Sequence, residues 1–243
     1  MRAVLPCAVA VLVLASAASQ SSGALIVPTA GDERFGWDEG FSGSVFASWD
    51  VFSTTTNATP ELGSFGTDVD TSTVTETTGM AFLTGGGNIY NASVATTLSV
   101  VVPTTSLSGT NTRFVAQVGT FGSVLDISSL LLNGQSASIA GLTEEMLVSS
   151  GFGAAFDNEY MAIWDIGSAP ESEYTLTFSG AGPHMSLEAV RIDAFASDTA
   201  FVTPASVTAV PEPASIGSML ALTCGGGIRW LRRRKSSIDA KRS

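Results

Sequence analysis

Apolar and polar residues alternate with a period of two along the middle of the chain. Within 174–178 the apolar side chains fall at every second position, and 185–195 continues the same alternation. Successive side chains of a β-strand point to opposite faces of a sheet, so this period predicts half-buried strands. Further Thr-, Ser- and Val-rich runs bounded by turn residues lie at 74–76, 93–102 and 113–118.

The runs at 174–178 and 185–195 are separated by a short segment of turn residues. Gly180, Gly182 and Pro183 lie in this segment, and such residues supply the dihedral angles that tight turns need. We therefore expect the two runs to form a β-hairpin.

Only one segment has the features of a helix. Thr143 stands at a position suited to an N-cap, Glu144 and Glu145 follow in the first turn, and the run stops by Gly151. We expect at most one short helix or turn, over residues 142–148.

About ten short strands with frequent turns predict an all-β fold. The favoured architecture is an antiparallel β-sandwich with a jelly-roll-like arrangement. A parallel α/β fold needs repeated helical segments between strands, which the pattern lacks. No clean internal repeat is visible, which argues against a propeller or a solenoid.

The N-terminus has the pattern of a secretory signal peptide. Met1 and Arg2 precede an apolar run over 3–15, and small residues follow it. We expect cleavage within Ala17 to Ala24. The apolar run is short for a membrane span and contains Pro6.

The C-terminus combines three features in a fixed order. The motif Val210, Pro211, Glu212, Pro213 comes first, an uncharged stretch over 214–228 follows, and a basic cluster ends the segment. A helix over the uncharged stretch would be roughly 22 Å long, against about 30 Å for a hydrocarbon core. With Trp230 and Leu231 it reaches roughly 27 Å, so membrane insertion is plausible but marginal. The cluster consists of Arg229, Arg232, Arg233, Arg234 and Lys235, and it is expected to stay cytoplasmic.

This C-terminal segment resembles the PEP-CTERM sorting signal of bacterial exported proteins. The resemblance implies recognition by an exosortase-type membrane protease, removal of the tail, and delivery to the cell surface or an extracellular polymer. The residues beyond the basic cluster, 236–243, depart from the pattern, since such signals often end close to the cluster. An ordinary membrane anchor that is never cleaved is the alternative.

These features divide the chain into five parts. They are a signal peptide at 1–24, a β-sandwich ectodomain at 25–196, a Ser/Thr/Ala/Pro-rich stalk at 197–209, the sorting segment with a single transmembrane helix at 210–235, and a tail at 236–243.

Charge and cysteine content limit the function of the ectodomain. Residues 24–209 contain twenty acidic residues, three arginines and no lysine, a formal charge of −17. Such a surface repels nucleic acid and anionic lipid. Cys7 and Cys224 both fall in the terminal segments, so the mature domain is expected to have neither a thiol nor a disulfide.

Carboxylates are the most abundant reactive groups of the ectodomain. Asp68, Asp70 and Glu76 are candidate ligands of a structural calcium ion, although Gly79 stands where an EF-hand loop requires glutamate. A hydrolase would need two carboxylates facing each other. Glu144 and Glu145 are adjacent, so in a strand they would point to opposite faces.

Histidine and tryptophan are the other candidates. His184 is the only histidine, no Gly-x-Ser-x-Gly motif accompanies it, and a catalytic role is not favoured. Trp37, Trp49 and Trp164 are candidate ligand-binding residues because indole rings stack on sugars, while core packing is the favoured interpretation.

The sequence therefore predicts a non-catalytic, exported cell-surface or extracellular-matrix protein that associates with extracellular polysaccharide. No cofactor is expected apart from a structural calcium ion. The alternative is a secreted hydrolase that acts on carbohydrate through a carboxylate pair.

Overall fold

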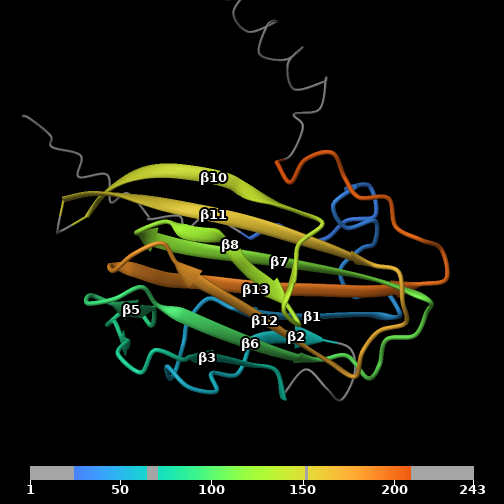
Figure 1. Ribbon diagram of the computed structural model, residues 1–243, viewed down its shortest axis with the longest axis horizontal. Helices are drawn as coiled ribbons and strands as arrows, with labels where there is room; N and C mark the ends of the chain where they lie inside the picture. The colour runs from blue at the N-terminus through green and yellow to red at the C-terminus, as the bar shows by residue number, and fades with distance from the viewer. Residues whose placement is uncertain (1–24, 65–70, 151–152, 209–243) are drawn as a thin grey trace, which may run out of the picture.

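Two antiparallel β-sheets make up the part of the chain that the structure describes (Figure 1). The computed structural model describes residues 25–64, 71–150 and 153–208. The larger sheet contains β1 (Ser44–Trp49), β2 (Leu62–Ser64), β4 (Phe82–Leu83), β5 (Ile89–Asn91), β7 (Asn111–Gly122), β10 (Ile139–Ser150), β11 (Gly153–Ile166) and β13 (Met185–Ser197). The smaller sheet contains β3 (Thr73–Glu76), β6 (Thr97–Pro103), β8 (Leu125–Leu132), β9 (Gln135–Ser136) and β12 (Glu173–Gly180).

Strand order places β13 near the middle of the larger sheet. That sheet runs β10-β11-β7-β13-β1-β2, and β5, which carries β4 on its other side, also pairs with β13. On β13, Met185–Leu187 pair with β5 while Val190–Phe195 pair with β1. The smaller sheet runs β3-β6-β12-β8-β9.

A shared apolar core joins the two sheets, which confirms the predicted all-β, antiparallel architecture. Tyr174, Leu176 and Phe178 of β12 are buried, and they belong to the same core as Trp49 and Phe114 of the larger sheet. The alternation in β12 thus marks the face that packs on the other sheet. Burial of these large side chains is the main stabilising contribution of the sandwich.

The predicted hairpin between 174–178 and 185–195 is wrong. Both segments are strands, but β12 pairs with β6 and β8, whereas β13 pairs with β7, β1 and β5. The connection through residues 181–184 therefore crosses from the smaller sheet to the larger one. A period of two identifies the buried face of a strand, and it carries no information about the neighbouring strand.

The predicted helix over 142–148 is also wrong, because these residues lie in β10. The register between β10 and β11 shifts between Leu142 and Glu144, so Thr143 occupies a β-bulge. Its hydroxyl donates to the carbonyl of Glu159 at 3.0 Å instead of capping a helix. The long neighbour β11 supplies backbone partners that outweigh the local helix signals.

The two ends of the described chain cover one half of the outer face of the larger sheet. Phe35, Trp37 and Val207 form a second buried cluster with Val115, Met161 and Ile163, which lie on β7 and β11. Both end segments lie at the right of Figure 1, in blue and in orange-red. The other half of this face has no such cover from the end segments.

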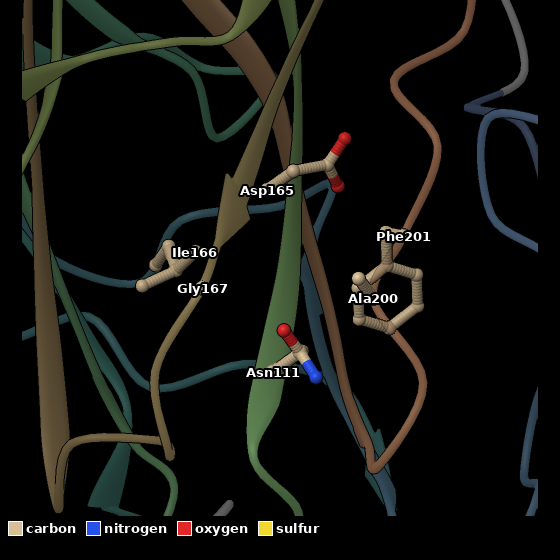
Figure 2. Close-up of a pocket in the computed structure, with 6 residues that line it drawn as sticks. All are labelled: Asn111, Asp165, Ile166, Gly167, Ala200 and Phe201. Atoms are coloured by element: carbon tan, nitrogen blue, oxygen red, sulfur yellow. The ribbon is translucent and has the colours of Figure 1, made fainter.

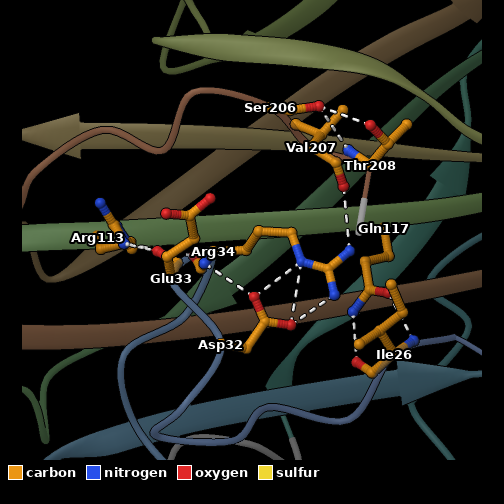
Figure 3. A network of polar contacts seen from close by, with 9 residues as sticks. All are labelled: Ile26, Asp32, Glu33, Arg34, Arg113, Gln117, Ser206, Val207 and Thr208. Carbon is orange, nitrogen blue, oxygen red and sulfur yellow. Dashed lines mark hydrogen bonds and ion pairs between the residues drawn. The ribbon is translucent and has the colours of Figure 1, made fainter. Parts of the chain in front are cut away.

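Buried arginines bind these segments to the sheet and to each other (Figure 3). The Nη1 group of Arg34 donates to the carbonyl of Val207 at 3.0 Å. Arg113 forms a bidentate pair with Asp165 at 2.6 and 2.9 Å and donates to the carbonyls of Glu33 and Val202. Gln117 holds Ile26 through two hydrogen bonds.

Much of the segment expected to be a stalk therefore belongs to the folded domain. Pro204 and Val207 are buried, and the hydrogen bonds from Arg113 and Arg34 reach carbonyls in this segment. A Ser/Thr/Ala/Pro-rich composition resembles that of a linker, but backbone carbonyls accept hydrogen bonds whatever their side chains are.

Several predictions concern residues outside the described ranges. These are the signal peptide, Asp68 and Asp70, and the sorting segment with its basic cluster. Within the described ranges, no helix has the length and apolar character needed to cross a membrane.

Candidate functional site

The three candidate tryptophans are buried in the domain. Trp49 is 0% exposed, and Trp37 and Trp164 are each 3% exposed. The indole Nε1 of Trp49 donates to the carbonyl of Ala58, and that of Trp164 donates to the carbonyl of Gln135, both at 2.9 Å. Their ring faces are covered by protein, so these indoles are not available for stacking on a ligand.

Glu76 holds a turn. Its carboxylate accepts hydrogen bonds from the backbone N–H groups of Thr78 at 2.7 Å and Gly79 at 2.9 Å. Among the described residues, no group of three or more His, Cys, Asp or Glu side chains is placed to hold a metal ion.

A small pocket lies where the chain leaves β11 (Figure 2). It is lined by Asn111, Asp165, Ile166, Gly167, Ala200 and Phe201, and its volume is ≈ 110 Å³. Ligand sites usually measure about 300–1,000 Å³. Asp165 also already accepts hydrogen bonds from Arg113 and Thr203, so this pocket is not a strong candidate.

The strongest candidate is the half of the outer face that the end segments leave open. In antiparallel sheets, residues directly opposite each other share a face. One row crosses five strands through the paired positions Asp157, Phe121, Ser186, Tyr90 and Phe82. The neighbouring row runs through Glu144, Glu159, Gly119 and Ala189.

We call this surface the open face. It is defined by Phe82, Asn88, Tyr90, Phe121, Glu144, Asp157, Glu159 and Glu188. Glu144, Asp157 and Glu159 lie on β10 and β11, Phe121 and Glu188 on β7 and β13, and Phe82 and Tyr90 on β4 and β5.

Glu159 is a buried carboxyl group of the open face. It is 6% exposed, and its Oε1 is buried without a hydrogen-bond partner in the described part of the chain. Burial, together with the nearby charges of Glu144 and Asp157, raises its pKa to about 7. Near neutral pH this side chain is therefore protonated about half of the time, beside ionisable carboxyl groups.

Glu188 extends the acidic region onto β13. It lies where the register between β13 and β7 shifts, and Asn88 donates to its Oε1 at 3.0 Å. Burial and the charge of Asp157 raise its pKa to about 7. Asp157 thus lies near both Glu159 and Glu188, and its own pKa is raised by burial and by Glu144.

Aromatic side chains form the opposite side of the open face. Phe82 is 53% exposed and packs edge-on against Tyr90, with ring centroids 5.5 Å apart. The hydroxyl of Tyr90 and Nδ1 of His184 form a hydrogen bond of 2.8 Å. His184 itself is exposed and has a φ of 67°, so it helps to position Tyr90.

The sequence alone does not reveal this face, because the carboxylates that meet on it come from different strands. Glu144 and Glu145 do point to opposite sides, but Glu144 meets Glu159 across the strand pair. One signal was present in the sequence: Asp157 and Glu159 are two residues apart, the spacing that places two side chains on one face of a strand.

Comparisons with protein-family models, with curated proteins and with solved structures found no match to this chain.

Proposed function

We propose that this chain is an exported, non-catalytic cell-surface or matrix protein that binds extracellular polysaccharide through the open face. The observation that carries the proposal is the exposed ring of Phe82, packed against the half-buried ring of Tyr90, beside the polar Asn88 and Glu188. Planar rings match the apolar faces of pyranoses, and carboxylates and amides accept or donate hydrogen bonds to sugar hydroxyls. A sheet face offers an extended surface suited to a polymer.

Export and sorting form the second part of the proposal. The pattern of the first 24 residues supports secretion, and the Pro-Glu-Pro motif supports recognition by an exosortase-type protease. The apolar stretch and the basic cluster support transient or permanent anchoring in the membrane. The negative charge of the domain argues against nucleic acid as a partner.

The finer architecture is also proposed. We interpret the sandwich as jelly-roll-like, because the chain repeatedly changes sheets between consecutive strands, from β6 to β7, from β7 to β8 and from β12 to β13.

A carbohydrate-active hydrolase is the second candidate function. It is favoured by Glu159, whose raised pKa suits a general acid, and by the nearby carboxyl groups of Glu144 and Asp157. Release of reducing sugar ends by the full chain, lost in Glu159→Gln, would support the hydrolase. Retention of the polymer without cleavage supports the binding function.

The sorting proposal predicts a defined C-terminus. In protein recovered from its own cell surface, mass spectrometry is expected to find a chain that ends near Pro211. An intact Arg-rich end would contradict processing and would instead indicate a permanent anchor.

A further inference from the structure

Within the described residues, no basic side chain forms an ion pair with the carboxyl groups of the open face. Glu144, Asp157, Glu159 and Glu188 come from β10, β11 and β13, and their mutual influence is seen in the raised pKa values. No lysine occurs between residues 25 and 208. The arginines of that range, Arg34, Arg113 and Arg191, form ion pairs with Asp32, Asp165 and Asp193.

The buried Oε1 of Glu159 is an independent indication of a ligand. It has no hydrogen-bond donor among the described residues, although only 6% of Glu159 is exposed to solvent. Buried polar atoms in folded proteins nearly always have a hydrogen-bond partner. The unpartnered Oε1 of Glu159 therefore points to a ligand that supplies a donor at the open face. The position opposite Glu159 on β7 is Gly119, which has no side chain to offer a donor.

The neighbouring aromatic residues restrict the kind of donor. Phe121 is paired with Asp157 on one side and with Ser186 on the other, and Ser186 is paired with Tyr90. A ligand that reaches the carboxylates across this row therefore also meets aromatic side chains. A small inorganic cation would use only the carboxylates, whereas an amino sugar combines a charged donor with an apolar ring face.

We infer that the open face binds the protonated amino groups of an amino-sugar polymer, with the ammonium at Glu159 and Glu188 and the sugar ring against Tyr90 and Phe121. This inference rests on the proposed polysaccharide-binding function and narrows its ligand. A polymer of uronic acids would be repelled by the same carboxylates. A fully N-acetylated polymer would offer N–H donors but no positive charge.

Binding of an ammonium group is expected to release protons. A nearby positive charge favours the ionised form of a carboxyl group, so the ligand would lower the pKa of Glu159 and Glu188 from about 7. The titratable groups that face Glu159 are Glu144 from β10 and Asp157 from its own strand. The paired positions on β7, Gly119 and Phe121, add none.

Isothermal titration of the full chain in non-ionic detergent tests the inference. The probes are a glucosamine hexamer and its fully N-acetylated counterpart. Each is titrated at about pH 6, where Glu159 and Glu188 are still largely protonated, in two buffers of different ionisation enthalpy. We expect the glucosamine hexamer to bind at least about 10-fold more tightly and to release about one to two protons.

Two variants, each with one glutamate replaced by glutamine, separate the site from the rest of the domain surface. Glu188→Gln is expected to weaken binding of the glucosamine hexamer by about 10-fold. Glu173→Gln, at an exposed position on the smaller sheet, is expected to leave binding unchanged. Equal losses in both variants, equal affinity for both hexamers, or no binding of the glucosamine hexamer would each overturn the inference. Retention of the chain on another polysaccharide would then leave the proposed function standing, and only its absence would contradict that function as well.

Discussion

Replacing Arg113 by alanine is expected to lower the free energy of unfolding by about 3–5 kcal/mol, a large part of the stability of a typical domain. Arg113 is 2% exposed, and its loss leaves the carboxylate of Asp165 without its bidentate partner. The carbonyls of Glu33 and Val202 also lose their donor. Because these carbonyls belong to the two end segments, both segments should detach early. Denaturant unfolding followed by tryptophan fluorescence measures the loss.

A double variant is the control for this prediction. Arg113→Met combined with Asp165→Leu removes both charges and keeps apolar volume, so it should recover most of the lost stability. A loss below about 1 kcal/mol in the single variant would contradict the role that we assign to Arg113.

The domain is expected to become less stable as the pH rises from about 4.5 to about 7. Glu159 and Glu188 have folded-state pKa values of about 7, above the ordinary glutamate value of 4.5. Between these values the folded state binds more protons than the unfolded state. The stabilising contribution is therefore full below about pH 4.5 and lost above about pH 7. Each group contributes at most about 3 kcal/mol to this pH dependence.

Glu159→Gln isolates this effect. The neutral amide resembles the protonated carboxyl, so the variant should be more stable than the parent at pH 8, by up to about 3 kcal/mol, and its pH profile should be flatter. Thermal unfolding between pH 5 and pH 8 measures both effects, with Glu173→Gln as the control. Burial also raises the pKa of Asp193 to about 6, so some slope will remain. If stability depended on pH equally in Glu159→Gln and the parent, a raised pKa of Glu159 in the folded state would be contradicted.

Local patterns predicted strands better than they predicted strand partners. The alternation at 174–178 and 185–195 identified β12 and β13, because the apolar face of a strand is encoded within its own residues. Pairing depends on residues far apart in sequence, and for this reason the predicted hairpin was wrong. The N-cap signal at Thr143 failed for a related reason, since β11 supplied partners that a local signal does not include.

The candidate site was harder to predict from the sequence than the strands were. The pairing of Glu144 with Glu159 depends on the register of a long hairpin that contains a bulge. The approach of Asp157 to Glu188 depends on β7 lying between β11 and β13. The ion pair of Arg113 with Asp165 likewise joins neighbouring strands of the larger sheet. The tryptophans illustrate the reverse case, because their size and apolarity already favoured the core.

The central claim is that the open face is the surface that binds polysaccharide. Its most direct test compares retention of the full chain on exopolysaccharide from its own cell for the parent, for Phe82→Ala with Tyr90→Ala, and for Phe41→Ala. Phe41 is 51% exposed and packs against Phe195, which contacts the second buried cluster, away from the open face. We predict at least about a 10-fold loss of affinity for the double variant and no change for Phe41→Ala. Equal retention of all three proteins, or no retention of the parent, would contradict the claim.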